Sequence, residues 1–224
     1  MRASDRAYHA LRDEIVDWEL PPGTVLAEVE QSQRLGISRT PLRAALARLT
    51  ADGLVAPQAG RGLVVTDVSL ENIRELFEVR RALEEQAARL AAERGSTEVF
   101  EALERELLAV SSLLEDADPA RRAYYDLVRR FDEAVDDAVG NPYLVTALRG
   151  LRTHLARIRR HAKDDPGRLR GAAAEHLTIV QAIIAHDAEL AAHATHVHLH
   201  RALRSALDTT STTPISDTVR PRPA

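Results

Sequence analysis

The 224-residue sequence contains no cysteine and no long uninterrupted hydrophobic run. Without cysteine, the chain has no disulfide framework, no thiolate metal site and no thiol redox switch. No apolar run approaches the roughly 20 residues that a membrane-spanning helix needs, and the amino terminus lacks the apolar core of a signal peptide. These absences predict a cytoplasmic protein without a membrane partner.

Signals for catalysis are also scarce. The sequence offers no cysteine nucleophile, no glycine-rich loop that would cradle phosphate and no recognisable pair of base and nucleophile. The formal net charge is −4, but residues 1–66 hold eight arginines against eight acidic residues, so the negative excess lies in the remainder of the chain. We therefore expect no enzyme, and positive charge that is local rather than spread over the whole protein.

The most informative segment is SRTPLRAALARL at residues 38–49, which carries three arginines and no acidic residue. Helical spacing puts Arg39 and Arg43 on one face. The opposite face is an apolar stripe of Leu42, Leu46 and Leu49. Ser38 is a suitable N-cap, and Pro41 falls in the first turn, where its missing N–H costs nothing. The pattern is typical of a DNA-reading helix, although an ordinary amphipathic helix with solvated arginines fits this segment alone.

The neighbouring segments favour the DNA-reading interpretation. Helices are expected over residues 7–18 and in a shorter segment that ends near Gly36. Two short strand-like runs follow, at residues 54–56 and 63–65. The loop between them contains Gly60, Arg61 and Gly62. Its glycines allow a tight backbone and its arginine supplies charge for a phosphate, so the order of elements predicts a winged helix-turn-helix.

The first 66 residues resemble the DNA-binding domain of the GntR family of bacterial transcription regulators. Three motifs carry the resemblance: PGTVLAE at residues 22–28, GISRTPLR at 36–43, and DGL at 52–54 before a Gly-x-Gly wing. One departure is Gln31-Ser32, where the family usually has Leu-Ala, so we expect the packing of the second helix to shift toward Val29 and Leu35. The resemblance implies these DNA-binding residues: Ser38, Arg39, Thr40, Arg43, Arg61 and Gly62.

From residue 69 onward the pattern is almost continuously helical, and alanine and leucine dominate the apolar faces. The expected helices span residues 70–94, 97–115, 119–139, 142–163, 168–185 and 188–208. Residues 209–224 are rich in Thr, Pro and Ser and lack periodicity, which predicts a disordered tail. The fold class is therefore mainly α, with a winged helix-turn-helix over residues 1–66 and an all-α bundle over residues 67–208.

The bundle resembles the FadR-type carboxy-terminal ligand-binding domain, the FCD domain. The resemblance is carried by LFEVRRALE at residues 76–84, by FDEAVDDAVGNPYL at 131–144, and by the closing helices around Glu175-His176 and His198-Leu199. It implies effector binding and dimerisation. Basic residues enter the site in relatives that bind organic acids, so Arg80 is a candidate effector contact, although an ion pair with Glu84 one turn away is the plainer expectation.

Many FCD domains hold a divalent metal ion with an aspartate, a histidine four residues later, and one histidine on each of the last two helices. The resemblance puts Val128 at the aspartate position and Asp132 at the first histidine position, with His176 and His198 at the others. Valine coordinates nothing, so the candidate metal and effector site is reduced to Asp132, His176 and His198, two histidines and a carboxylate that would hold one zinc, nickel or manganese ion. The alternative is a vestigial site that binds its effector without metal.

Four histidines crowd the last helix, at positions 193, 196, 198 and 200. Residues two positions apart lie about 200° around a helix, so His198 faces away from the other three. We expect His193, His196 and His200 to form a solvated face, and the alternative is a surface metal or pH-sensitive patch.

The sequence thus predicts a ligand-responsive transcription regulator, more often a repressor in this family, that binds a palindromic operator in double-stranded DNA as a homodimer. Its effector is expected to be a small organic acid. One alternative is a constitutive DNA-binding regulator whose effector site has decayed. The other alternative is a metal-dependent helical enzyme that uses Asp132, His176 and His198.

Overall fold

The computed structural model describes residues 1–60, 62–110, 114, 121–161 and 166–212. The chain forms two compact units. The first consists of Met1–Leu70, Arg152–Ala162 and Thr210–Ala224, and the second of Glu71–Leu151 and Lys163–Thr209. Both are mainly helical, and a two-stranded antiparallel sheet lies in the first, so the expected fold class is confirmed. Among the described residues, no helix is long and apolar enough to cross a membrane.

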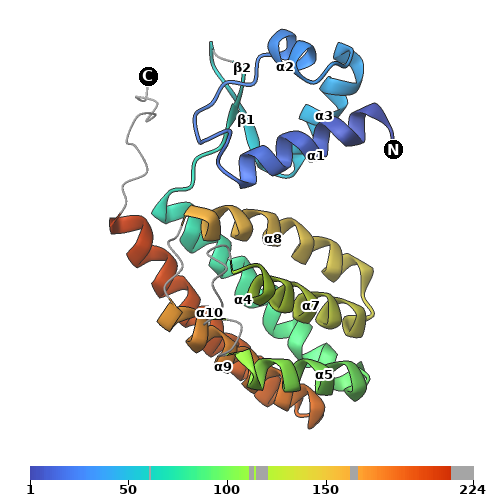
Figure 1. Ribbon diagram of the computed structural model, residues 1–224, viewed down its shortest axis with the longest axis vertical. Coiled ribbons are helices and arrows are strands. Elements are labelled where there is room, and N and C mark those ends of the chain that lie inside the picture. Colours follow the sequence, from blue (N-terminus) through green and yellow to red (C-terminus); the bar gives the residue numbers. More distant parts are fainter. Residues whose placement is uncertain (61, 111–113, 115–120, 162–165, 213–224) are drawn as a thin grey trace. The chain divides into compact units, whose positions relative to one another are not determined.

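Three helices and a hairpin form the amino-terminal part of the first unit (Figure 1). The helices are α1 (Ala3–Val16), α2 (Glu28–Arg34) and α3 (Arg39–Ala51), followed by β1 (Val55–Gln58) and β2 (Gly62–Val65). The strands pair antiparallel, with Val55 opposite Val65 and Gln58 opposite Gly62. This is the predicted order of a winged helix-turn-helix.

The core of the first unit comes from the apolar stripes of α1 and α3 and from the hairpin. Its buried members are Leu11, Ile15, Leu26, Leu42, Leu46, Leu49, Leu54, Val55 and Val65. The leucines that were predicted from spacing as the buried stripe of α3 are each at most 2% exposed. Because these side chains leave water together, they fix the face that α3 turns outward.

Some local expectations for this unit were wrong. The first helix spans Ala3–Val16 rather than residues 7–18. It begins earlier than expected, and it ends before Trp18, which adopts a left-handed conformation with φ of 65°. Ser38 stands at the N-cap position of α3, but its side chain makes no capping hydrogen bond. At the Gln31-Ser32 departure, Gln31 is 4% exposed. Its amide oxygen accepts hydrogen bonds from Arg34, and the Ser32 hydroxyl donates to the carbonyl of Ile37 at 2.6 Å.

The packing shift expected beside Gln31-Ser32 holds for Leu35 but not for Val29. Leu35 packs against the core, whereas Val29 is 50% exposed. Polar groups with local hydrogen bonds thus replace the usual apolar pair on α2.

A buried arginine lies in the Arg152–Ala162 segment of the first unit. The Arg157 side chain is 1% exposed, and it donates hydrogen bonds to the hydroxyl and the carbonyl oxygen of Thr66. The Trp18 indole N–H donates to the carbonyl of Arg157 at 2.8 Å. Burial lowers the pKa of Arg157 to about 10, so the guanidinium still carries its charge at neutral pH.

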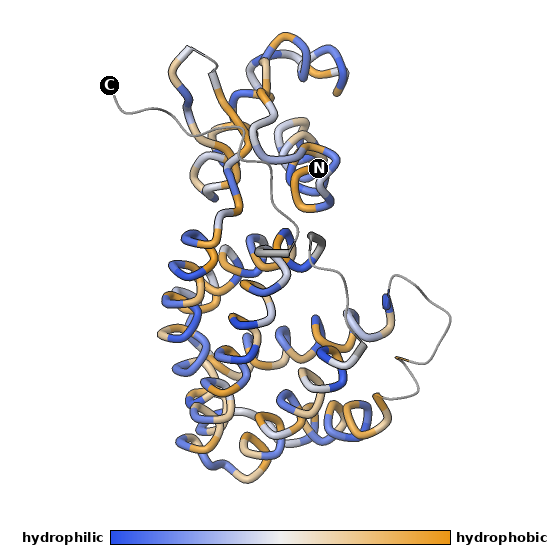
Figure 2. Tube along the Cα trace, turned by 90° about the vertical axis from the view of Figure 1, so that its left-hand side faces the viewer, coloured by the Kyte–Doolittle hydropathy of each residue, from blue (hydrophilic) through white to orange (hydrophobic). Residues whose placement is uncertain are grey.

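The second unit is a helical bundle. Its helices are α4 (Leu70–Arg94), α5 (Thr97–Leu108), α7 (Arg122–Val139), α8 (Pro142–His161), α9 (Pro166–Ile184) and α10 (Ala188–Thr212), of which α4, α8 and α10 extend past the unit's bounds. Hydrophobic and hydrophilic residues alternate along these helices (Figure 2), so each can bury one face.

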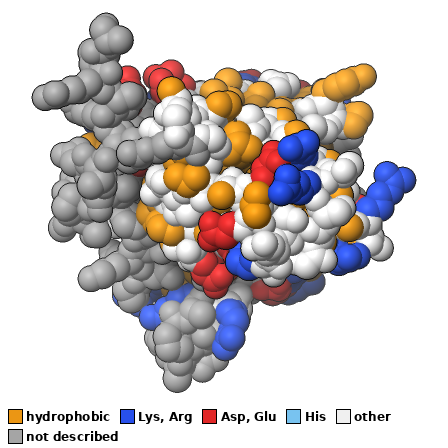
Figure 3. Space-filling view, turned by 90° about the horizontal axis from the view of Figure 1, so that it is seen from above, with side chains coloured by type: hydrophobic (Ala, Val, Ile, Leu, Met, Phe, Trp, Pro, Cys, Tyr) orange, Lys and Arg blue, Asp and Glu red, His pale blue; other side chains and the backbone are white. Residues whose placement is uncertain are grey.

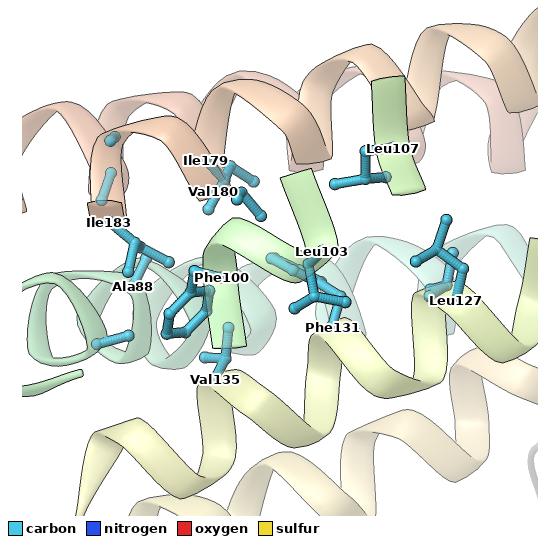
Figure 4. Packing of buried hydrophobic residues seen from close by; sticks show 14 of the residues in the cluster. Ala88, Phe100, Leu103, Leu107, Leu127, Phe131, Val135, Ile179, Val180 and Ile183 are labelled. Atoms are coloured by element: carbon cyan, nitrogen blue, oxygen red, sulfur yellow. The ribbon is translucent and has the colours of Figure 1, made fainter. Parts of the chain in front are cut away.

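The bundle core is formed where α5 packs against α7 and α9. Figure 4 shows Phe100, Leu103 and Leu107 of α5 among side chains of the neighbouring helices. Phe131 of α7 belongs to the same cluster and is 7% exposed. Val128, one turn earlier on α7, is also a core residue, at 5% exposed.

Most predicted breaks between the bundle helices are confirmed. Gly140 ends α7 in the left-handed region, and the Asn141 side chain accepts hydrogen bonds from the first backbone N–H groups of α8. His186 is left-handed before α10, and Asp187 caps that helix through the N–H of Leu190.

Other boundaries of the bundle helices differ from the expectation. The helix expected over residues 97–115 ends at Leu108, where the Ala109 N–H bonds to the carbonyl of Glu106, three residues back. The last helix continues to Thr212, so residues 209–212 are helical and not part of a disordered tail. Thr209 fits because its hydroxyl bonds to the carbonyl of Ser205. Residues 213–224 of the expected tail, and residues 119–120 and 162–163 at predicted helix ends, lie outside the described residues.

Candidate DNA-binding face and buried polar cluster

The predicted DNA-binding residues of α3 share an exposed region at its amino-terminal end. Ser38, Arg39 and Thr40 lie in or beside the first turn and are exposed, and Arg43 follows one turn later, also exposed. The α3 leucines behind them are buried, so these polar side chains point away from the core. A basic helix end of this kind matches the way a recognition helix presents its first turns to the major groove.

The two arginines of this region differ in their surroundings. Arg39 makes no hydrogen bond or ion pair with any residue that the structure describes. Arg43, four residues later, is paired with Glu28 of α2: its Nε lies 2.8 Å from one carboxylate oxygen and 3.1 Å from the other. Glu28 was not predicted from the sequence as a partner of Arg43, because 15 residues separate the two in the chain.

The wing residue Gly62 begins β2 with φ of +81°, and Gly60 has φ of +74°. Both conformations favour glycine, and a Cβ at either position would meet nothing within 4 Å. The open backbone would let the wing approach a polyanion closely. Arg61, the predicted basic residue of the wing, lies outside the described residues.

Figure 3 shows how charged side chains are distributed on one face of the protein. On the face seen in Figure 3, arginine side chains lie as separate groups, and acidic side chains stand beside some of them. Such a surface offers individual contacts rather than one continuous basic patch.

A second group of polar side chains is buried in the bundle, and we call Arg80, Glu175, His176 and His198 the buried polar cluster. Arg80 is 3% exposed. Its Nε and Nη2 donate to the two carboxylate oxygens of Glu84 at 2.7 and 3.2 Å, and its guanidinium lies 4.5 Å from the centre of the Phe77 ring. The plainer expectation, an ion pair with Glu84, is thus confirmed.

Glu175 joins α9 to α10 through His198. The Nδ1 of His198 lies 2.8 Å from a Glu175 carboxylate oxygen. Burial lowers the pKa of His198 despite this hydrogen bond, so the ring is neutral at pH 7. A neutral ring beside a carboxylate donates through Nδ1, which leaves Nε2 as an acceptor.

Glu175 itself is held as an anion. Burial would raise the pKa of its carboxyl group, but the hydrogen bonds from His198 and Arg168, together with the charge of Arg168, outweigh that effect and lower it. Arg168 donates to both carboxylate oxygens at 3.1 and 3.2 Å, and Arg201 donates to one at 3.3 Å. This role of Glu175 was not predicted from the sequence, although its position directly before His176 was a signal.

The structure brings His176 and His198 together but does not assemble the predicted three-residue metal set. The two imidazole rings lie 4.5 Å apart between centres, and His176 stacks on Phe131 at 4.9 Å. Asp132 is half-buried on α7, next to Phe131. Among the described residues, no group of three or more His, Asp or Glu side chains is arranged to hold a metal ion.

The other histidines of α10 are exposed, as predicted, and His198 is 7% exposed on a different face. The Nδ1 of His196 lies 2.9 Å from Glu85, and the Nδ1 of His193 lies 2.7 Å from the carbonyl oxygen of Glu189. These contacts belong to a solvated helix face.

Comparison with protein families finds a match to each part of the chain. The model described as "Bacterial regulatory proteins, gntR family" matches residues 3–65. The model of the FCD domain matches residues 75–201.

Individual proteins agree with these matches. An uncharacterized HTH-type transcriptional regulator of Agrobacterium vitis is 46% identical over 82 residues, 37% of this chain and 48% of that protein, so the chain spans about half the length of this relative. A probable D-xylose utilization operon transcriptional repressor of Paenarthrobacter nicotinovorans is 33% identical over 83% of this chain and 80% of that protein. The solved structure of E. coli McbR/YncC superposes with a TM-score of 0.73 at 20% identity, covering 93% of this chain and 98% of that one, which shows the shared fold.

Proposed function

Because this chain belongs to the GntR family of bacterial regulatory proteins and carries an FCD domain, we propose that it is a ligand-responsive regulator that binds a palindromic operator as a homodimer. The chain is a DNA-binding transcriptional regulator and not an enzyme, and the proposal starts from this. Residues 1–66 would bind DNA, and residues 67–208 would bind the effector and dimerise. Such a protein works in the cytoplasm, where bacterial DNA lies.

The observation that carries the DNA-binding part is the exposed basic end of α3 above its buried leucine stripe. In the proposal, Arg39 and Arg43 contact base edges or phosphates in the major groove. Ser38 and Thr40 bind the DNA backbone, and Arg61 with Gly62 binds at the wing. One recognition helix covers only a half-site, so two copies related by a twofold axis would bind half-sites about one helical turn apart.

Arg43→Ala tests this role directly. If Arg43 binds a guanine, the variant should lose about 1 to 3 kcal/mol of specific binding free energy while binding to random DNA changes little. Anisotropy titrations on an operator duplex and on a random duplex would measure both. Equal weakening on the two duplexes would make Arg43 a phosphate contact instead.

We propose that the effector is a small organic acid bound at Arg80, Asp132, His176 and His198. Within the described residues, the Nη1 of Arg80 makes no hydrogen bond, so part of this buried guanidinium remains available to an anion. The neutral His198 adds an acceptor for a hydroxyl or a protonated carboxyl group. Repression is the proposed sign of regulation, since the Paenarthrobacter relative is named a probable repressor.

The metal ion implied by the FCD resemblance does not fit the residues present. Val128 occupies the position of one ligand and is packed in the apolar core, and among the described residues no group of three or more His, Asp or Glu side chains is arranged to hold a metal ion. We therefore propose that the effector is bound without metal. Elemental mass spectrometry of the purified, unchelated protein tests this. Near-stoichiometric zinc, nickel or manganese that disappears in an Asp132→Ala, His176→Ala double variant would contradict it.

Thermal unfolding with acetate, pyruvate, lactate, malonate and citrate tests the response to an effector. A ligand that binds only the folded chain raises the melting temperature, by an amount equivalent to about 2.7 kcal/mol at one hundred times its dissociation constant. The proposal expects such a rise with at least one acid and its loss in Arg80→Met. No rise with any of the five acids would favour a constitutive regulator.

A further inference from the structure

We infer that Glu28 is a positioning residue for Arg43, directing its guanidinium toward base edges and away from phosphates. The inference rests on the proposed role of Arg43 in DNA binding. It adds a residue of α2 that controls how selective this contact is.

The backbone that carries Glu28 is firmly held. Glu28 is the first residue of α2. Two positions earlier, Leu26 is 2% exposed and its N–H bonds to the carbonyl oxygen of Leu63 at 2.8 Å. This hydrogen bond ties the start of α2 to the hairpin, so the Glu28 side chain extends from a fixed backbone position.

The backbone position of Arg43 on α3 is also fixed. Its neighbour Leu42 is 0% exposed and Leu46, one turn on, is 2% exposed, so this part of the helix cannot rotate without opening the core. The side chains of Arg43 and Glu28 are 65% and 38% exposed. The pair thus lies at the surface, within reach of a bound duplex.

The geometry of the pair leaves one edge of the guanidinium available. Both contacts with Glu28, at 2.8 and 3.1 Å, are made by Nε. Among the described residues, Nη1 and Nη2 of Arg43 make no hydrogen bond. These two groups form the end-on fork that matches O6 and N7 of guanine.

Charge adds a second effect. A phosphate attracts an arginine mainly through its net charge, and the adjacent carboxylate offsets that charge and repels the phosphate. A base edge is neutral, and its contact with arginine depends on the direction of the N–H donors. The carboxylate therefore weakens a base contact much less than a phosphate contact. Glu28 therefore weakens the unselective contact more than the selective one, which is how a repulsive element produces specificity.

The chain provides a matched control in Glu30. This residue is also an acid in the first turn of α2, and it is exposed. It makes no hydrogen bond or ion pair with Arg43, whose contacts are with Glu28 alone among the described residues. Glu28→Gln and Glu30→Gln remove the same charge two residues apart, and only the first removes a charge that is paired with Arg43.

The experiment uses the full chain with two duplexes of about 30 base pairs, long enough for two half-sites. One is selected from a random-sequence pool by the wild-type protein, and the other has the same composition in shuffled order. The measured quantity is the selectivity ratio, the dissociation constant for the shuffled duplex divided by that for the selected one. Titrations at several salt concentrations add the salt slope for the shuffled duplex.

Glu28→Gln is expected to lower the selectivity ratio about two- to fivefold, the range of an exposed ion pair. Its salt slope on shuffled DNA should steepen by up to about 0.9, because Arg43 becomes available to one more phosphate. Glu30→Gln should leave the ratio unchanged. In an Arg43→Ala background, Glu28→Gln should change the ratio no further, since the residue it positions is gone.

Two failures are distinguishable. If Arg43→Ala leaves the ratio at the wild-type value, the proposed function of Arg43 is wrong. If Arg43→Ala lowers the ratio but Glu28→Gln does not, or lowers it equally in the Arg43→Ala background, the inference about Glu28 alone is overturned. Unchanged melting temperatures and helical circular dichroism would verify that all variants are folded.

Discussion

Replacing Glu175 by glutamine tests the buried polar cluster that joins α9 to α10. The Glu175 side chain is 5% exposed and His198, its partner at 2.8 Å, is 9% exposed. The other partners are less enclosed, with Arg168 at 22% and Arg201 at 61% side-chain exposure. The buried hydrogen bond to His198 should therefore dominate the effect.

The expected loss follows from these exposures. A hydrogen bond to a charged group contributes about 1.5 to 3 kcal/mol. The two arginine pairs add about 0 to 1 kcal/mol each, with the exposed Arg201 near the lower limit. Glutamine keeps one oxygen acceptor, so Glu175→Gln should lower the free energy of unfolding by about 2 kcal/mol. In a chain of this length, that corresponds to a melting temperature about 4 to 8 °C lower.

The loss should depend on pH in one direction. The pKa of Glu175 is lowered in the folded state, so the unfolded chain takes up the proton first as pH falls. The stabilisation by the carboxylate is complete above the unfolded pKa of about 4.3 and is lost as pH falls through the folded pKa. The difference between wild type and Glu175→Gln should thus be full at pH 7 and smaller at pH 4.

Urea unfolding followed by helical circular dichroism at the two pH values measures this difference. Glu189→Gln removes a carboxylate from an exposed ion pair with Arg89 and serves as the control, which should behave like wild type. Equal stability of Glu175→Gln and wild type at pH 7, or a difference that persists unchanged at pH 4, would refute the assigned role of the carboxylate.

Three further changes have defined outcomes. Leu46→Ala in the buried stripe of α3 should lower the free energy of unfolding by about 2 to 5 kcal/mol in urea titrations, and a loss under 1 kcal/mol would contradict the assigned core. Arg157→Ala removes the donor to Thr66 and should cost about 2 kcal/mol, whereas the exposed Arg159→Ala should cost almost nothing. The pKa of His198 is lowered by burial, so wild-type stability should decline as pH falls below about 6.5, and a His198→Gln variant that declines equally there would sink this assignment.

The DNA-binding half was predictable because its signals are local. Leucines at helical spacing marked the buried side of α3, and glycines between two apolar runs marked the hairpin. The end of α1 was not predictable, because Trp18 leaves the helix in a left-handed conformation that its sequence does not announce. The Glu28–Arg43 pair joins two helices and depends on how they pack.

The bundle illustrates the same limit. The Gly140-Asn141-Pro142 break follows from local capping chemistry and was predictable. Two sites were not. Thr209 extends α10 because its hydroxyl bonds back to Ser205, and Glu175 meets His198 only through the packing of α9 on α10. Spacing indicated that His198 faces away from its neighbours, but not which carboxylate it faces.

Selection of DNA from a random duplex pool by the purified full-length chain tests the central claim most directly. The account predicts enrichment of an inverted repeat with half-sites about one helical turn apart, and loss of that enrichment when Arg39 and Arg43 are both replaced by alanine. A pool that shows no enriched motif, or a motif that the double variant selects as well as wild type, would contradict it.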